Sequence, residues 1–558
     1  MHAAQKMNLG RFALDRAEWQ AILFDTPNRA DLALCVPRWA CQIIRVRVHR
    51  NHGFEPVSTG TAAYGAWNGL AFEWIIGGYD DSLSFDMRDD ADIEVIWLDS
   101  GRLRDTVGNT LGEWLVARLR ALRSLTANPI LALIWPLATA EREFVNGASG
   151  RATYLPDLET LAAEADKRWL DRRTEAISGT RLSNQACLRV ARELACCWLP
   201  ATVIPPLKAV AVDLDGTLFG GVLGEDGPSN LELTAGHVAL QNHLAELRQR
   251  GVLLALVSRN EMRDVEDLFA CRTDFPLRLH DFSAVEVSWG DKAAALERIA
   301  TKLSIGADSV VFVDDNPGEL LAVATSSPVF TVHARPDGGE TEIALAHAAG
   351  LFRWRESTED RLRADDLLAS ESRVAIARSA GSPEDYFRSL RVHLDYFVGS
   401  RKHLARVAEL VLKTNQFNLS LRRMKEAEIA RRLEELPSNV IAIRLVDRLS
   451  DSGIVGVLVG SHEGDSMHVE EICVSCRALG RGLEDRMLTQ ALLLLAGDRA
   501  PCRFTFDLHK GPRNGPARQW LAQYAQIDLA DATDRVEMPF EAVVAKPNSS
   551  VIQTEVIR

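Results

Sequence analysis

Four short strings hold the residues with which this sequence could do chemistry. They are Asp213-Leu214-Asp215-Gly216-Thr217, Ser258, Lys292 and Asp314-Asp315-Asn316. Carboxylates together with a lysine suit phosphoryl transfer, because a divalent cation and a fixed ammonium group neutralise the phosphate oxygens. One acidic pair alone is usually a solvated turn, but the four strings in this order indicate a phosphoryl-transfer site.

The elements that must position these residues are predicted strands and helices in alternation. Apolar runs at 209–214, 252–257 and 310–313 predict strands, and helices are predicted at 234–250, 261–270 and 292–303. Strands without apolar alternation, each followed by a helix, are typical of a parallel sheet covered on both faces. Ligands of such sheets bind beyond the carboxyl ends of the strands, so we expect the four strings to converge there.

This pattern resembles the four motifs of the haloacid dehalogenase (HAD) phosphatase superfamily. The resemblance implies that Asp213 attacks phosphorus and that Asp215 is the general acid and then the base. It also implies which residues bind the phosphate group and which bind the metal ion. Thr217, Ser258 and Lys292 would bind phosphate, and Asp213, Asp215, Asp314 and Asp315 would hold Mg²⁺, a cation that prefers oxygen ligands.

Three further strings resemble the FkbH-like family of polyketide biosynthesis. They are the glycine-rich stretch 219–227, the stretch 314–319, and Leu412-Lys413-Thr414-Asn415-Gln416-Phe417-Asn418-Leu419. The resemblance implies an enzyme that dephosphorylates 1,3-bisphosphoglycerate and loads a glyceryl group onto the phosphopantetheine thiol of an acyl carrier protein. Lys413, Asn415 and Gln416 would contribute to substrate binding. The chain departs from the family at Gly216 and Phe219, where Asn and Trp are usual, and both departures bear on the substrate.

The string 477–482 resembles the R/Q-x-x-G-x-G/A loop of the GNAT acyltransferase fold. Arg477, Gly480 and Gly482 would bind the pantetheine arm, because backbone N–H groups at a helix N-terminus attract pyrophosphate. The neighbouring Cys476 is a candidate for an enzyme-bound glyceryl thioester, since a thiolate is a competent acyl acceptor. The alternative for Cys476 is a buried, small apolar residue.

The complete chain is expected to be an α/β protein. We predict an N-terminal α/β domain of unassigned role at 1–200, a HAD-like parallel sheet at 201–353, a helical connector at 354–382 and a GNAT-like domain at 383–558. In the first of these, strands are predicted at 93–98 and 129–135, helices at 108–125, 157–174 and 184–198, and an irregular packed loop at 64–79.

Composition excludes several other classes of protein. The 558 residues carry 64 Lys and Arg against 77 Asp and Glu, a net charge of −13, which argues against a nucleic-acid partner. No apolar run approaches the roughly 20 residues of a membrane span. Nine scattered cysteines suit a reducing compartment, so a cytoplasmic protein is expected. No carrier attachment motif stands out, so the carrier protein would act in trans.

Two other functions are compatible with the sequence. One is a HAD phosphatase of another small phosphorylated metabolite, in which the GNAT-like domain is structural. The other is a non-catalytic scaffold that docks carrier proteins.

Overall fold

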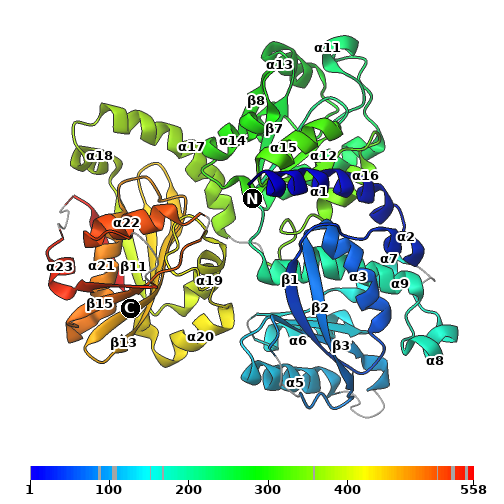
Figure 1. Cartoon of the computed structure of the whole chain (residues 1–558), viewed down its shortest axis with the longest axis horizontal. Coiled ribbons are helices and arrows are strands. Elements are labelled where there is room, and N and C mark those ends of the chain that lie inside the picture. Colours follow the sequence, from blue (N-terminus) through cyan, green and yellow to red (C-terminus); the bar gives the residue numbers. More distant parts are fainter. Residues whose placement is uncertain are drawn as a thin grey trace. The chain divides into compact units, whose positions relative to one another are not determined.

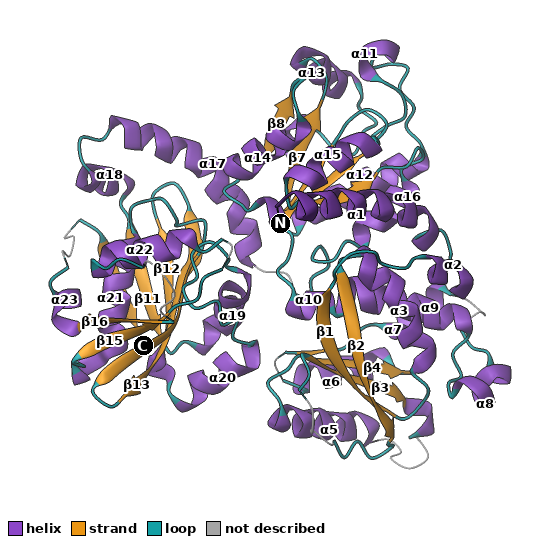
Figure 2. Ribbon diagram, viewed as in Figure 1, coloured by secondary structure: helices purple, strands orange, loops and turns teal. Residues whose placement is uncertain are grey.

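The computed structural model describes residues 2–85, 90–103, 110–150, 152–165, 169–355, 358–511, 513–529, 534–546 and 551–558. The chain forms two compact units, Met1–Arg355 and Glu356–Arg558 (Figure 1). Three β-sheets carry the architecture, two in the first unit and one in the second (Figure 2). Among the described residues, no helix is both long enough and apolar enough to cross a membrane.

The N-terminal half of the first unit contains a five-stranded parallel sheet in the order β2-β1-β3-β4-β5. Its strands are β1 (Gln42–Arg50), β2 (Leu70–Tyr79), β3 (Ile93–Asp99), β4 (Ile130–Trp135) and β5 (Thr153–Tyr154). Its helices are α1 (His2–Leu23), α2 (Arg29–Leu34), α3 (Glu55–Trp67), α5 (Leu111–Leu125), α6 (Thr139–Ala148), α7 (Leu158–Glu164), α8 (Glu175–Ser178) and α9 (Asn184–Glu193). All seven residues of β3 are buried, as expected for a central parallel strand.

Two predictions for this region were wrong. The segment 64–79 is not an irregular loop: it contains the end of α3 and all of β2, which pairs in parallel with β1. Its glycines serve packing, since a Cβ at Gly65 would lie 2.8 Å from the ring of Phe72. The predicted helix 157–174 is α7 followed by a separate turn of 3-10 helix, Arg172–Thr174, and its residues 166–168 lie outside the described residues.

The central sheet is also parallel and has the order β10-β9-β6-β7-β8. Its strands are β6 (Ala209–Val212), β7 (Leu253–Ser258), β8 (Ala284–Val287), β9 (Val310–Asp314) and β10 (Phe330–His333). The helices are α10 (Pro200–Val203), α11 (Leu223–Asp226), α12 (Ala235–Gln249), α13 (Met262–Cys271), α14 (Lys292–Lys302), α15 (Pro317–Ser326) and α16 (Gly339–Ala346). The expected alternation of strand and helix is therefore confirmed.

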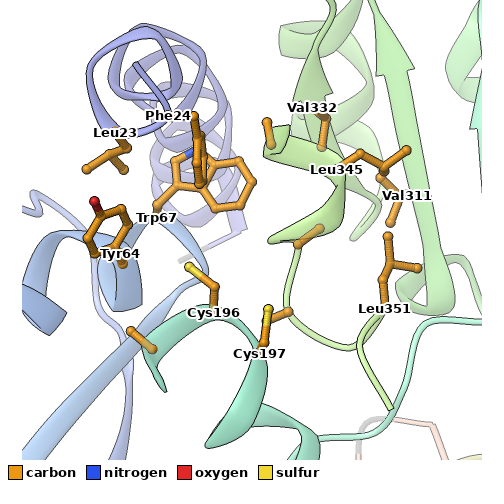
Figure 3. Close-up of a cluster of buried hydrophobic side chains, with 14 of the residues drawn as sticks. Leu23, Phe24, Tyr64, Trp67, Cys196, Cys197, Val311, Val332, Leu345 and Leu351 are labelled. Atoms are coloured by element: carbon orange, nitrogen blue, oxygen red, sulfur yellow. The ribbon is translucent and has the colours of Figure 1, made fainter. Parts of the chain in front are cut away.

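A continuous hydrophobic core joins the two halves of the first unit. Trp67 of α3 packs edge-on against Phe330 of β10, with ring centroids 5.4 Å apart. Figure 3 shows part of this core, in which Trp67 and Tyr64 lie near Cys196 while Val332, Val311 and Leu351 belong to the central half. The boundary predicted near residue 200 thus falls inside one compact unit, and separate domains at 1–200 and 201–353 remain a prediction.

The second unit is built on a seven-stranded sheet in the order β16-β15-β14-β13-β12-β11-β17. The strands are β11 (His393–Val398), β12 (Val440–Val446), β13 (Asp451–Glu463), β14 (Ser466–Val474), β15 (Arg503–Asp507), β16 (Arg535–Pro539) and β17 (Gln553–Ile557). The helices are α17 (Thr358–Ser379), α18 (Pro383–Leu390), α19 (Leu404–Lys413), α20 (Glu426–Glu435), α21 (Glu484–Ala496), α22 (Gly515–Ala525) and α23 (Phe540–Val544).

The sequence also predicts strands at 440–446, 454–460 and 468–474 and a helix from residue 482, and these correspond to β12, β13, β14 and α21. Strand β11 was not predicted. The expected α/β fold class is confirmed. The predicted connector is largely α17, which contacts β13 within this unit.

Candidate functional site

Two buried carboxylates and one buried lysine meet at the carboxyl edge of the central sheet. Asp213 directly follows β6, Asp314 ends β9, and the backbone N–H of Asp213 donates to the carbonyl of Val313 at 2.9 Å. Lys292 begins α14, and its Nζ lies 2.9 Å from Oδ2 of Asp213 and 2.6 Å from Oδ2 of Asp314. The expected convergence of the strings is therefore present, with the ammonium group between the two acids.

Burial shifts the pKa values of Asp213, Asp314 and Lys292. It raises the pKa of Asp213 to about 7, because the attraction of Lys292 offsets only part of the desolvation and Asp314 adds repulsion. Burial also raises the pKa of Asp314. For Lys292, burial alone lowers the pKa, but the charges of Asp213 and Asp314 raise it above its ordinary value. The lysine is therefore held as a cation.

Three carboxylates form a cluster that fits a divalent metal ion. Asp213, Asp314 and Asp315 each offer one oxygen, and these oxygens lie within 4.8 Å of one another. An all-oxygen, acidic set of donors suits Mg²⁺, a hard cation that retains some of its waters. Asp215 is not a member of this cluster, so its predicted role as a metal ligand remains a prediction.

The side chain of Asp215 is held by two donors instead. Its Oδ1 accepts the backbone N–H of Leu223 at 2.7 Å, and its Oδ2 accepts Nδ2 of Asn260 at 2.7 Å. The first contact exists because the glycine-rich stretch after residue 219 turns back over the strand end, with Gly221 at φ 101°. These donors orient the carboxylate, as a group that exchanges protons with a substrate requires.

Asn260 is a residue of this site that the sequence prediction missed. Its Nδ2 also donates to Oγ of Ser258 at 2.9 Å, and its side chain is buried. It therefore links the predicted phosphate-binding serine to the predicted general acid. The sequence feature that could have identified Asn260 is its position two residues beyond Ser258, which ends β7.

Gly216 and Thr217 form the turn that directly follows Asp215. Gly216 has φ 64°, and a Cβ at this position would lie 2.3 Å from Oδ2 of Asp315. The turn therefore leaves no room for a side chain unless Asp315 moves. Thr217 is fully buried, and its Oγ1 has no hydrogen-bond partner within the described part of the chain.

The string 412–419 lies in the second unit, alongside β14. The carbonyl of Phe417 accepts the N–H of Val474 at 2.9 Å, and the N–H of Leu419 donates to the carbonyl of Ile472 at 3.2 Å. On its other side, the carbonyl of Leu419 accepts the N–H of His509 at 2.9 Å. Since β15 pairs with β14 only over Ser466–Val469, residues 417–419 pair with the later part of β14.

Two polar residues of the same string have partners inside the unit. Lys413 pairs with Glu409, and Oδ1 of Asn415 accepts a hydrogen bond from Arg423. Gln416 is half-buried. Their predicted role in binding substrate remains a prediction.

The loop before α21 has the backbone expected of its glycines, with φ 79° at Gly480 and 71° at Gly482. Cys476 is half-buried, and Arg477 is buried with its backbone N–H 3.3 Å from Oγ of Ser475. The N–H of Gly480 donates to Oε1 of Glu484 at 2.6 Å. An incoming pyrophosphate would have to displace this carboxylate, so binding of pantetheine by Arg477, Gly480 and Gly482 remains a prediction.

The fold and the site together indicate a type of chemistry. A parallel α/β sheet whose strand ends bring together a buried lysine and a set of acidic oxygens has the make-up of a metal-assisted phosphoryl-transfer site.

Comparisons with known proteins add distant similarities only. No family model and no curated protein matches the chain. One similar solved structure is the N-terminal part of protein BF1531 from Bacteroides fragilis, which contains a phosphatase domain and is complexed with Mg (18% identity, 56% of this chain and 95% of that chain covered, TM-score 0.45).

Two further solved structures are also similar. One is diaminobutyrate acetyltransferase EctA from Paenibacillus lautus (14% identity, 27% and 96% covered, TM-score 0.21). The other is a fungal multi-domain β-N-acetylglucosaminidase with a GCN5-related glucosamine N-acetyltransferase region (10% identity, 93% and 68% covered, TM-score 0.18). Similarities this distant carry no weight for the activity of the chain.

Proposed function

We propose that the chain is a magnesium-dependent, HAD-type phosphatase coupled to an acyl transferase. Its substrate would be 1,3-bisphosphoglycerate, and its product a glyceryl thioester on the phosphopantetheine arm of an acyl carrier protein supplied in trans. The observation that carries the proposal is Lys292, whose Nζ lies within 3 Å of both Asp213 and Asp314 at the sheet edge.

The phosphatase half follows from the residues around Asp213. An oxygen of Asp213 attacks phosphorus, the bond from phosphorus to the leaving oxygen breaks, and Asp215 gives its proton to that oxygen. Asp215 then takes a proton from a water that attacks the aspartyl phosphate, which releases phosphate and restores Asp213. Ser258 and Lys292 hold the phosphoryl oxygens. A magnesium ion on Asp213, Asp314 and Asp315 would supply the charge that brings the anionic substrate and the anionic nucleophile together.

The acyl-transfer half rests on the strings 412–419 and 477–482 of the second unit. The thiolate of Cys476 attacks the carbonyl carbon of the acyl phosphate, the bond from carbon to the phosphate oxygen breaks, and phosphate leaves. The carrier thiol then attacks the resulting thioester and regenerates Cys476. The remaining phosphate is removed at the Asp213 site.

A second candidate is a phosphatase of another small phosphorylated metabolite, in which the second unit is structural. The contact between Gly480 and Glu484 favours it, because it occupies one of the amides that a pyrophosphate would need.

Intact-mass spectrometry of a holo carrier protein, incubated with the full chain, Mg²⁺ and 1,3-bisphosphoglycerate, tests the proposal. We expect a glyceryl adduct on the carrier that is lost in Cys476→Ser and that retains a phosphate in Asp213→Asn. Cys502→Ser, at an exposed cysteine of the same unit, is the matched control and should keep it. Phosphate release without an adduct would reject acyl transfer and support the second candidate. An adduct at the full rate in Cys476→Ser would reject the relay through this thiol.

A further inference from the structure

A second cluster of possible metal ligands lies in the first unit, away from the acidic strings. It consists of Glu193, Cys197 and His347, which each offer one ligand atom, and these atoms all lie within 4.8 Å of one another. Glu193 ends α9, and Cys197 belongs to a short π-helix, Leu194–Trp198, that continues it. Single-turn π-helices are frequent at functional sites. His347 follows α16 of the central half.

The histidine is oriented as a metal ligand would be. Its Nδ1 lies 2.7 Å from the carbonyl oxygen of Ile343, and a carbonyl can only accept, so Nδ1 carries the proton. The other ring nitrogen, Nε2, points at Oε1 of Glu193, 2.9 Å away. A backbone carbonyl that holds the proton of one ring nitrogen is the usual outer support of a histidine that binds metal through the other nitrogen.

The cluster borders the apolar core of the first unit, and Arg192 is a charged neighbour, with its Nη2 3.3 Å from Oε1 of Glu193. Cys197 and His347 are buried, and the ring of His347 packs 5.5 Å from that of Phe24. Figure 3 shows Cys196 and Cys197 leaving the helix in different directions within this core. The side chain of Glu193 keeps 19% of its surface exposed, so the cluster is not wholly enclosed.

We propose that Glu193, Cys197 and His347 form a binding site for a transition-metal ion of the zinc class. One thiolate, one imidazole and one carboxylate suit Zn²⁺ rather than Mg²⁺, because sulfur and nitrogen ligands favour the softer ion. Two ligands of a tetrahedral zinc lie about 3.3 Å apart at bond lengths of about 2.0 Å, so Nε2 and Oε1 separate slightly on binding.

The ion would link the two halves of the first unit. Helix α9 and the π-helix belong to the N-terminal half, and His347 belongs to the central half. The alternative is an ion pair between Glu193 and His347 without any metal. That pair would need a second proton on the imidazole, at Nε2, whereas the metal uses the Nε2 lone pair.

Cobalt substitution of the chelator-treated full chain distinguishes the two. We expect one equivalent of Co²⁺ to give visible bands and a sulfur-to-cobalt charge-transfer band, both displaced by Zn²⁺. The charge-transfer band should disappear in Cys197→Ser, and it should weaken at least tenfold at equal cobalt in His347→Gln. Cys196→Ser, which changes the adjacent buried thiol, is the control and should retain the band. A wild-type chain that shows no such band, or a band that survives in Cys197→Ser, would overturn the proposal.

A second measurement uses only the wild-type chain, so its result does not depend on whether a variant folds. X-ray absorption at the zinc edge of the wild-type chain, loaded with one equivalent of Zn²⁺, should show one sulfur at about 2.3 Å and nitrogen or oxygen neighbours at about 2.0 Å. A shell of nitrogen and oxygen alone would reject the site.

Discussion

Glu471 of β14 allows the most quantitative prediction, through the substitution Glu471→Gln. Its side chain is 1% exposed, and burial raises its pKa from an ordinary 4.5 to about 7, although Ser420, Cys473 and Arg423 lie close enough to offset part of the effect. Glutamine has nearly the same shape and no charge. The substitution therefore removes the titration and leaves the packing almost unchanged.

The sign of the effect follows from the raised pKa. Below pH 4.5 the carboxyl group is protonated in the folded and the unfolded chain, so its titration does not change the free energy of unfolding. Between 4.5 and about 7 the unfolded chain loses the proton and the folded chain keeps it, so stability falls as the pH rises. Above about pH 7 the buried carboxylate lowers the free energy of unfolding by its full amount, about 3 kcal/mol. Glu471→Gln should therefore stabilise the second unit at alkaline pH and have little effect under acid conditions.

Hydrogen exchange of the β14 amides, measured by mass spectrometry on the full chain, is the assay. At about pH 8 the variant should exchange more slowly than the wild type by on the order of a hundredfold, and at about pH 5 by less than about tenfold. Comparing the two proteins at the same pH cancels the intrinsic effect of pH on exchange. Glu435→Gln, at an exposed position of α20, is the control and should change neither rate. Equal exchange of wild type and Glu471→Gln at about pH 8 would contradict a destabilising charge at this position.

Three further predictions concern the other buried charges and the tight turn. Lys292→Met leaves two buried carboxylates without their cation, so it should lower the free energy of unfolding by about 3 to 5 kcal/mol in urea and abolish phosphate release; activity within tenfold of wild type would contradict this. Gly216→Ala should raise the Mg²⁺ concentration needed for half-maximal phosphate release, because its Cβ would meet Asp315, whereas Gly224→Ala, with open space around the added atom, should not; equal requirements would contradict this. Asp366→Asn should speed hydrogen exchange in α17, because Asp366 lies 2.8 Å from Arg481 in a buried ionic cluster; unchanged exchange would contradict this.

The cluster of Asp213, Lys292 and Asp314 was largely predictable because its residues stand at the edge of the sheet where the apolar strands end. In a parallel sheet the carboxyl ends of neighbouring strands share an edge, so Asp213, Ser258 and Asp314 had to lie near one another once the strands were recognised. Lys292 was predictable for the same reason, at the start of a helix on that edge. The positions of these polar residues relative to the predicted strands and helices therefore predicted that their side chains lie close together.

The second unit was predictable in outline only. Its strands and helices follow from periodicity, but the position of residues 417–419 beside β14 depends on hydrogen bonds to Val474 and His509, which are distant in sequence. The contact of Glu484 with Gly480 also required the tertiary structure, since a loop with two glycines does not show what occupies its amides.

The α/β class, the parallel central sheet and the acidic strings at its edge could be predicted from the amino-acid sequence, because strand periodicity and strand-end chemistry are local properties. Only the tertiary structure decided that Asn260 bridges Ser258 and Asp215, that residues 64–79 form helix and strand, and that Glu193 and Cys197 meet His347 across about 150 positions. The physical reason is that such contacts depend on how distant elements bury their apolar faces together, and local patterns do not encode that arrangement.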